Sequence, residues 1–370
     1  MLFDERPKES LRDFYDMRES VEGFIKGVRS GRALILVLGM RRTGKTSLVR
    51  SCLNELGYPY VMVDLKGFWG SPGSSLHEFY TVLEESINRF IGRWRRLTSY
   101  LKLVEGVAIH GFSVRLKTGG RRRFNLTSFL HRLDDVGRDY GRAVLVFDEA
   151  QLFRNVNGLN IVQHVSYAYD NLRNLVVVLT GSEIGLLYDL LRIGDPGSPL
   201  YGRYVYEVRT RRFSRGESME FLREGFREYG LEVPGPVIEE AVDLLDGVPG
   251  WLTLYGSMYV SLRSRDVVYR VLEKASRIVH EELEKFLATR GVARRRYVAA
   301  LKLLAEQPAS WSEIKRSIEY LEGRRVSDRS LYNILQNLVK TGMVEKKDGE
   351  YRITDPILKY SVKTMPSTHR

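Results

Sequence analysis

The residues best suited to chemistry form one short run, Gly39-Met40-Arg41-Arg42-Thr43-Gly44-Lys45-Thr46-Ser47. Its spacing matches the pattern G-x-x-x-x-G-K-[ST], and it stands between an apolar strand and a helical segment. The glycines let the backbone turn around a phosphate, and the amides at the helix start point at the anion. Lys45 would reach the terminal phosphates, and Thr46 would bind magnesium. The run therefore predicts a nucleotide site, the alternative being an ordinary glycine-rich turn.

A pair of acids, Asp148 and Glu149, follows directly on the apolar strand Ala143–Phe147. In a parallel sheet the carboxyl end of this strand faces the phosphate site. Because phosphoryl transfer needs positioning and charge neutralisation, Asp148 would hold magnesium through water and Glu149 would polarise the attacking water. The alternative is a strand end whose acids are only solvated. With Lys45 and Thr46 upstream, the pair predicts an ATPase.

Two hydroxyl groups and one guanidinium complete the candidate catalytic set. Thr180 and Ser182 close the strand Leu175–Thr180, where a hydroxyl could sense the terminal phosphate. Arg203 stands at the start of the next strand and could stabilise transition-state charge, in its own site or in a neighbouring subunit's. A plain turn and a solvated surface arginine are the alternatives. The sequence leaves the choice between Thr180 and Ser182 open.

Short apolar runs separated by helical periods predict an α/β fold, a parallel sheet with helices on both faces. The strand candidates are Ala33–Leu38, Tyr60–Leu65, Ala143–Phe147, Leu175–Thr180 and Tyr204–Val208. A short hairpin is expected between the second and the third. Only helical periods follow the last strand, as in a helical lid subdomain. The predicted domain limits are 1–212, 213–289 and 290–370.

The segment from Arg290 onward has the order helix, helix, helix and hairpin, which is typical of a winged helix-turn-helix. Its third helix, Ser327–Thr341, would enter a DNA major groove, and the hairpin 343–354 would touch the DNA backbone. The segment holds 17 basic and 9 acidic residues, so it carries most of the net charge of +12. Contact with double-stranded DNA is predicted for Arg324, Arg325, Arg329, Lys340, Lys346 and Lys347. A protein-docking module is the alternative.

Composition limits the class of protein. With 370 residues, 43% of them hydrophobic, the chain has two or three domains and a sizeable core, which excludes a disordered protein. The single cysteine, Cys52, excludes a disulfide framework. No apolar run approaches the roughly 20 residues of a membrane span, so a cytoplasmic protein without a membrane partner is predicted.

Two arginine clusters are interpreted as solvated faces or as a patch for nucleic acid or an acidic partner: Arg89, Arg93, Arg95 and Arg96, and Arg121, Arg122 and Arg123.

A series of motifs, taken in order, resembles the archaeal ATPase family, which belongs to the STAND branch of AAA+-related P-loop NTPases. The motifs are LFDERPKESLRDFYDMRESVE, GMRRTGKTSLVR, VLVFDEAQ, LTGSE, LYGR, GVPGWL and YRITDPIL. The phosphate loop and the acidic strand are shared by many P-loop families. The pair Arg41-Arg42, the GVPG element and the terminal TDP are more specific, and the resemblance covers nearly the whole chain.

The resemblance implies an AAA+-like ATPase core, a helical lid and a winged helix, with ATP, ADP and Mg²⁺ as ligands. Pro249 of the GVP element would lie near the nucleotide and couple its state to domain orientation. Tyr15 and Arg18 match an entry segment that borders the adenine. Where many AAA+ proteins have asparagine after the fourth strand, this chain has Thr180-Gly181-Ser182, so the sensor residue is not carried over.

Taken together, the motifs predict an ATP-binding switch. It would hydrolyse ATP slowly with magnesium and use the nucleotide state to reorient a helical lid and a winged helix. One alternative is a DNA-binding initiator or transcription regulator in which ATP licenses DNA binding. A second alternative is a protein-interaction scaffold whose winged helix binds a partner.

Overall fold

The computed structural model describes residues 1–365 except 70, 72, 93, 95, 96, 111, 112, 118 and 120–122. The described chain forms two compact units. The first, called here the sheet unit, contains Pro7–Gly39 and Gly44–Thr210. The second, called the C-terminal unit, contains Met1–Arg6, Met40–Thr43 and the chain from Arg211 onward. Several arginines of the two basic clusters lie outside the described residues, namely Arg93, Arg95, Arg96, Arg121 and Arg122.

The main sheet confirms the predicted α/β fold. Its parallel strands lie in the order β2-β5-β6-β1-β7. They overlap the predicted apolar runs and are β1 (Leu34–Leu38), β2 (Tyr60–Asp64), β5 (Ala143–Asp148), β6 (Leu175–Gly181) and β7 (Tyr206–Arg209). Because β6 lies between β1 and β5, the segments that follow these two strands flank the end of β6. Such an order places three chemically important strand ends side by side.

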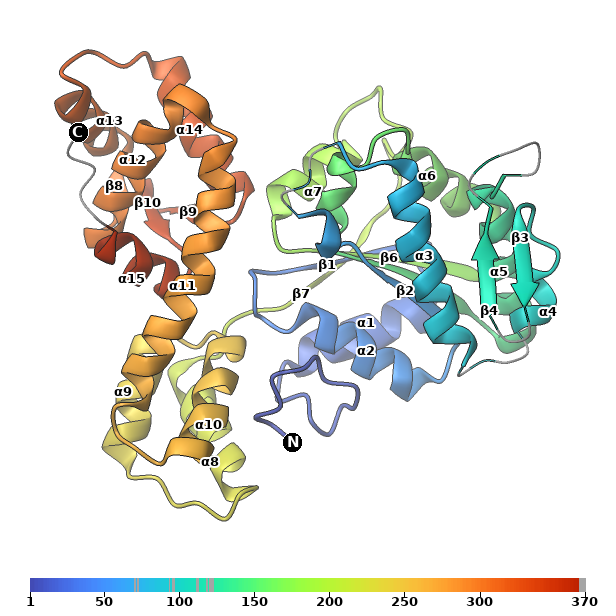
Figure 1. The fold of residues 1–370 in the computed structure, drawn as a ribbon, viewed down its shortest axis with the longest axis horizontal. Helices are drawn as coiled ribbons and strands as arrows, with labels where there is room; N and C mark the ends of the chain where they lie inside the picture. The colour runs from blue at the N-terminus through green and yellow to red at the C-terminus, as the bar shows by residue number, and fades with distance from the viewer. Residues whose placement is uncertain are drawn as a thin grey trace. The chain divides into compact units, whose positions relative to one another are not determined.

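Helices cover both faces of this sheet (Figure 1). Leu34, Leu36 and Leu38 of β1 belong to one apolar core, and Ile35 and Val37 belong to the other. This alternation follows from the period of two along a strand. The central strands are buried on both faces, which explains their continuous hydrophobicity. One layer contains α1 (Arg18–Arg29) and α2 (Lys45–Leu56), and the other contains α3 (Leu76–Ile91), α5 (Leu126–Tyr140) and α6 (Ile161–Asn171).

Shorter elements connect these layers. The predicted hairpin is present as β3 (Val107–His110) and β4 (Ser113–Leu116), which pair in antiparallel fashion. The Asn88 side chain of α3 holds β4, because it donates to the Val114 carbonyl (2.8 Å) and accepts from the Val114 amide (2.7 Å). The remaining short helices are η1 (Lys66–Phe68), α4 (Leu97–Leu101), η2 (Ala150–Asn155) and α7 (Ile184–Leu191).

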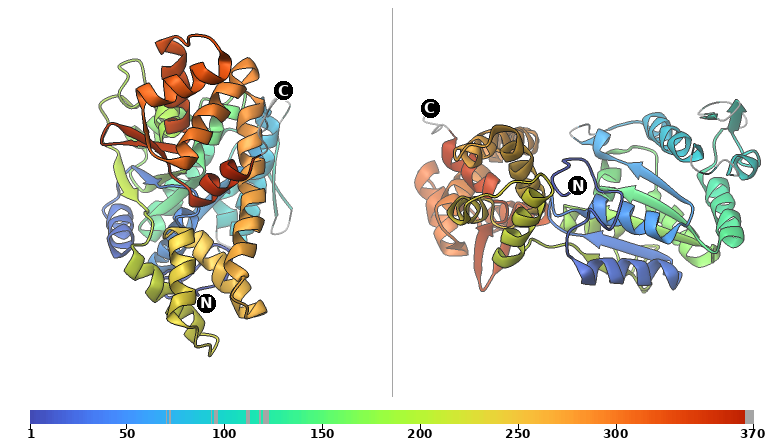
Figure 2. Two further views of the ribbon diagram at one scale, coloured as in Figure 1. Left: turned by 90° about the vertical axis from the view of Figure 1, so that its left-hand side faces the viewer. Right: turned by 90° about the horizontal axis from the view of Figure 1, so that it is seen from below.

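The C-terminal unit begins with four helices. These are α8 (Arg215–Arg227), α9 (Gly235–Leu245), α10 (Pro249–Leu262) and α11 (Val267–Ala288). Phe3 of the N-terminal segment packs against Phe221 and Phe226 of this bundle, with ring centroids 5.7 and 5.0 Å away. The long helix α11 extends from this bundle to the winged helix, as Figure 1 and the left view of Figure 2 show.

The winged helix follows in the predicted order, and the predicted third helix is α14. Its elements are η3 (Gly291–Ala293), α12 (Arg294–Glu306), β8 (Ala309–Ser310), α13 (Trp311–Glu322), α14 (Asp328–Lys340), β9 (Val344–Lys347), β10 (Glu350–Ile353) and α15 (Pro356–Thr364). Sequence patterns missed β8, which joins the hairpin in the order β8-β10-β9. They also missed α15, which packs on α11 and α12. A strand of two residues has no period to recognise.

In the described part of the chain, no helix combines the length and the hydrophobicity that crossing a bilayer requires. The domain limits 1–212, 213–289 and 290–370 remain predictions.

Candidate functional site

The phosphate loop joins β1 to α2 and is shaped by a left-handed glycine. Gly44 has φ +89° and caps α2, and a Cβ at this position would lie 3.2 Å from the Phe14 ring. The backbone angle therefore favours glycine, and the Phe14 ring leaves little room for a side chain. Lys45 is 5% exposed, and its Nζ donates to the Gly39 carbonyl at 2.9 Å. Lys45, at the C-terminal end of the loop, is thus hydrogen-bonded to Gly39 at its N-terminal end.

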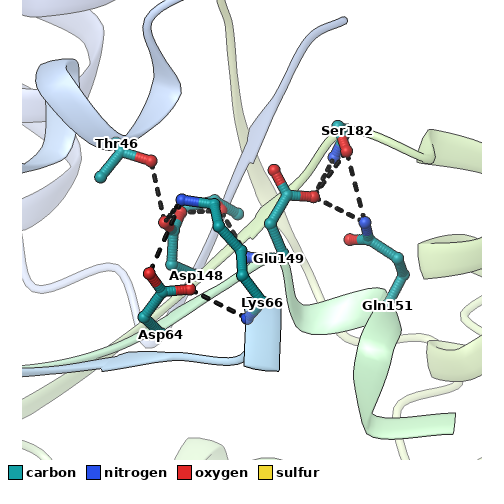
Figure 3. A network of polar contacts seen from close by, with 8 residues as sticks. Thr46, Asp64, Lys66, Asp148, Glu149, Gln151 and Ser182 are labelled. Atoms are coloured by element: carbon teal, nitrogen blue, oxygen red, sulfur yellow. Dashed lines mark hydrogen bonds and ion pairs between the residues drawn. The ribbon is translucent and has the colours of Figure 1, made fainter. Parts of the chain in front are cut away.

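Asp148 is the centre of the polar network at the end of β5 (Figure 3). Its side chain is fully buried, yet both carboxylate oxygens are hydrogen-bonded. Thr46 donates to Oδ2 at 2.8 Å, and Thr180 donates to Oδ1 at 2.5 Å. The two residues predicted to bind a metal, Thr46 and Asp148, are therefore in direct contact. A hydroxyl beside a carboxylate is an all-oxygen pair, which suits a hard divalent cation.

Glu149 is held by a second set of bonds. It has φ +56°, and its amide donates to the Thr180 hydroxyl at 3.0 Å. Its Oε2 accepts from Ser182 Oγ at 2.5 Å and from Gln151 Nε2 at 2.6 Å. The structure thus separates the two hydroxyls that the sequence could not rank. Thr180 orients Asp148 and the backbone of Glu149, whereas Ser182 binds the Glu149 carboxylate.

Besides Gln151, two polar residues of this network, Asp64 and Lys66, were not singled out in the sequence. Asp64 ends β2 directly opposite Asp148 in the parallel register. Lys66 Nζ lies 3.1 Å from Asp148 Oδ2 and 3.7 Å from Asp64 Oδ2. Burial lowers the pKa of the Lys66 ammonium, but Asp148 and Asp64 more than offset this, so the pKa stands above its ordinary value. The sequence did offer one signal for Asp64, since a carboxylate near the end of the predicted strand Tyr60–Leu65 resembles the position of Asp148 after its own strand.

Several predicted residues lie apart from these contacts. Arg203 forms a two-pronged ion pair with Asp170 of α6, with Nε–Oδ1 at 2.9 Å and NH2–Oδ2 at 2.6 Å. Ser47 accepts from the Lys8 amide at 3.0 Å. Tyr15 is half-buried just before α1, and Arg18 is the exposed first residue of that helix. The roles predicted for Arg203, Tyr15 and Arg18 stay predictions.

The middle of the phosphate loop, Met40–Thr43, belongs to the C-terminal unit. Gly250, which follows Pro249 at the start of α10, donates its amide to the Arg42 carbonyl at 2.9 Å. A Cβ on Gly250 would approach the Arg42 Cβ to 2.8 Å, so glycine permits this contact. Arg42 also pairs with Glu282 of α11 at 2.9 Å, and Arg41 pairs with the same carboxylate at 3.3 Å.

The same contact continues toward the end of the chain. The Arg42 guanidinium lies 4.2 Å from the centroid of the Trp251 ring. Trp251 Nε1 donates to the Asp355 carboxylate at 3.2 Å, and that carboxylate accepts from the Ile357 amide at the start of α15. Burial raises the pKa of the Asp355 carboxyl, and the Arg42 charge partly offsets this. The GVPGWL motif, through Trp251, therefore contacts the TDP motif, although Trp251 and Asp355 are 104 residues apart in the sequence.

Comparison with known proteins decides the family. A family model described as an ATPase domain predominantly from Archaea matches residues 25–254. The chain belongs to this archaeal ATPase family. A second model, the C-terminal winged helix-turn-helix domain of MCM proteins, matches residues 291–354 of the archaeal ATPase. No curated protein gave a significant sequence match.

Solved structures agree with this assignment. A Walker-type ATPase of Pyrococcus abyssi is 34% identical, with 98% of this chain and 100% of that chain covered and a TM-score of 0.83. The ORC2 protein of Aeropyrum pernix, solved in ADPNP and ADP complexes, is 14% identical, with coverage of 98% and 96% and a TM-score of 0.62. At that identity the second likeness shows the fold alone.

The winged helix of this archaeal ATPase carries the basic residues singled out in the sequence. Arg325 and Arg329 are exposed near the start of α14, and Lys346 and Lys347 are exposed on β9. Arg324 is exposed but pairs with Glu322 at 3.2 Å. Lys340, in the last turn of α14, is half-buried. Exposed cations therefore lie just before the third helix, on that helix and on the wing.

Replacing Thr180 with valine should destabilise the protein. The variant keeps the side-chain shape but removes the hydroxyl that bonds both Asp148 and the Glu149 amide. Leaving such buried groups unpaired costs about 1–3 kcal/mol, and the free energy of unfolding should fall by about that amount in urea denaturation. Thr180→Ser keeps the hydroxyl and is the matched control. Equal stability of the valine and serine variants would contradict this account of the network.

Proposed function

We propose that this archaeal ATPase binds ATP with Mg²⁺ and hydrolyses it. The observation that carries the proposal is the network in which Thr46, at the start of α2, is bonded to Asp148 at the end of β5, and Thr180 of β6 is bonded to Asp148 and Glu149. Lys45 supplies a buried cation at the phosphate loop. The nucleotide complexes of the Aeropyrum pernix ORC2 protein support ATP and ADP as ligands of this fold.

The phosphate loop and the polar network would have different tasks in this chemistry. Lys45 and the amides at the start of α2 bind the phosphates, and Glu149 accepts a proton from water as it attacks the terminal phosphorus. Ser182 and Gln151 orient the Glu149 carboxylate through their bonds to Oε2. Thr46 and Asp148 would hold Mg²⁺, which neutralises charge on the phosphate oxygens when bound.

Two substitutions separate binding from hydrolysis. Lys45→Ala should abolish ATP binding, because it removes the cation that contacts the phosphates. Glu149→Gln should retain ATP and lower turnover by at least about a hundredfold, because an amide cannot take up the proton. Equilibrium binding of a fluorescent ATP analogue and steady-state phosphate release measure the two effects. Equal turnover of wild type and Glu149→Gln would refute the base assignment.

We also propose that the protein is a STAND-type switch, in which nucleotide state reorients the helical lid and winged helix. Arg41 and Arg42 lie between the two glycines of the phosphate loop but pair with Glu282 of α11. A change in loop conformation on ATP binding would alter these pairs and the cation–π contact with Trp251. Asp355 would pass the change to α15, whose N-terminus it caps.

Hydrogen exchange tests this coupling. Glu282→Ala removes the shared partner of Arg41 and Arg42, so ATP binding should persist while its effect on amide exchange in α14 and α15 is lost. Glu273→Ala is the matched control, because Glu273 lies on the same helix and pairs with Arg277, one turn away, at 2.6 Å. A nucleotide-dependent change of the same size in Glu282→Ala and wild type would exclude this route.

A second candidate is DNA binding licensed by ATP, and the exposed cations on α14 and β9 favour it. Charge reversal at Lys346 and Lys347 should weaken duplex DNA binding by about tenfold at 0.1 M salt and reduce its salt dependence, because phosphate contacts release counterions. Lys359→Glu, an exposed position on α15, is the control. ATPase activity with no duplex affinity in wild type at low salt would favour a protein-docking role for the winged helix.

A further inference from the structure

Lys66 occupies an unusual position in the polar network of the sheet unit. Its ammonium and the Thr46 hydroxyl bond the same oxygen, Asp148 Oδ2, at 3.1 and 2.8 Å (Figure 3). Asp148 is fully buried, whereas the Lys66 side chain is 49% exposed. The carboxylate is therefore fixed in place, and the lysine is the partner that has room to move.

A second carboxylate stands ready to receive this ammonium. Asp64 Oδ2 lies 3.7 Å from Lys66 Nζ, and Asp64 Oδ1 accepts from the Lys66 amide at 2.9 Å. This hydrogen bond from the Lys66 amide holds the turn after β2. The Lys66 backbone is therefore fixed beside both acids. A small movement would transfer the ammonium from Asp148 to Asp64 without exposing an unpaired charge.

The shared oxygen is the one that a metal bound at Thr46 would need. A magnesium ion keeps several waters and is held by few protein groups, so a carboxylate next to its hydroxyl ligand accepts from a metal-bound water. The Lys66 ammonium donates to Asp148 Oδ2 and so takes the place of that donating water. Coulomb repulsion between the ammonium and a divalent cation also opposes their presence at one site.

We propose that Lys66 competes with magnesium for Asp148 Oδ2 and so sets the metal concentration at which the nucleotide binds. Lys66 moves to Asp64 when the metal–nucleotide complex enters. Lys66 is thus a positioning residue that acts through Asp148. The inference rests on the proposed ATP site and concerns its dependence on metal.

A magnesium titration tests this competition without measuring hydrolysis. Binding of N-methylanthraniloyl-ATP is followed at fixed nucleotide while Mg²⁺ is varied. Lys66→Met should lower the half-saturating Mg²⁺ concentration about two- to fivefold, the range expected from losing one half-exposed ion pair. Lys66→Arg keeps the charge and should stay near wild type. Lys26→Met, an exposed lysine on α1, should change nothing.

A second variant should shift the half-saturating Mg²⁺ concentration in the opposite direction. Asp64→Asn removes the alternative partner of Lys66, so the ammonium should stay on Asp148 and the half-saturating Mg²⁺ concentration should rise. Repeating the titrations at about 0.1 and 0.5 M KCl separates contact from long-range charge, because salt screens exposed charges but not a direct pair. The shift in Lys66→Met should persist at the higher salt.

The outcomes distinguish the two proposals. Analogue binding by wild type with an unchanged or raised magnesium midpoint in folded Lys66→Met would overturn the role of Lys66 and leave the ATP site standing. If Lys66→Met does not fold, an unchanged or lowered midpoint in Asp64→Asn overturns it equally. Absence of analogue binding by wild type at any magnesium concentration would overturn the ATP site and the competition together.

Discussion

The buried carboxylate of Asp148 is the constraint around which the sheet unit's site is organised. A charged group without exposure must be bonded on its oxygens, because an unpaired buried charge is strongly destabilising. The chain meets this need with donors from three separate segments, Thr46 at the start of α2, Thr180 at the end of β6, and Lys66 after β2. Satisfying one acid thus brings the ends of four segments to one place. The strand order makes this possible, since β6 lies between β1 and β5 and β2 lies beside β5.

The middle of the phosphate loop is held by ion pairs with the C-terminal unit, to which it belongs. Arginines between two loop glycines would by charge alone suit a phosphate, yet Arg41 and Arg42 share the Glu282 carboxylate in the C-terminal unit. Arg42 also stacks on Trp251, whose indole bonds Asp355 at the cap of α15. Arg41 and Arg42 therefore contact residues of α10 and α11, and these contacts are the basis of the switch proposed above.

Charged side chains are arranged differently in the two units. In the sheet unit a few charged side chains, Lys45, Lys66 and Asp148 among them, are held by short contacts and contribute little to the overall surplus. In the winged helix, exposed cations on α14 and β9 produce a surface field in which position matters less than number. Most of the net charge of +12 lies in the segment from Arg290 onward, so it reflects the winged helix more than the charged groups of the site.

Sequence alone determined the strands, the phosphate loop, the acidic pair and the winged helix, because each depends on residues close together in the chain. A buried parallel strand is continuously apolar, and a phosphate loop needs its glycines and lysine at fixed spacing. Only the tertiary structure decided which groups share a bond across long separations. It assigned Thr180 to Asp148 and Ser182 to Glu149, brought Lys66 and Asp64 into the network, and joined Arg42 to Trp251 and Asp355. Such pairs depend on strand order and helix packing, and a local pattern contains no information about either.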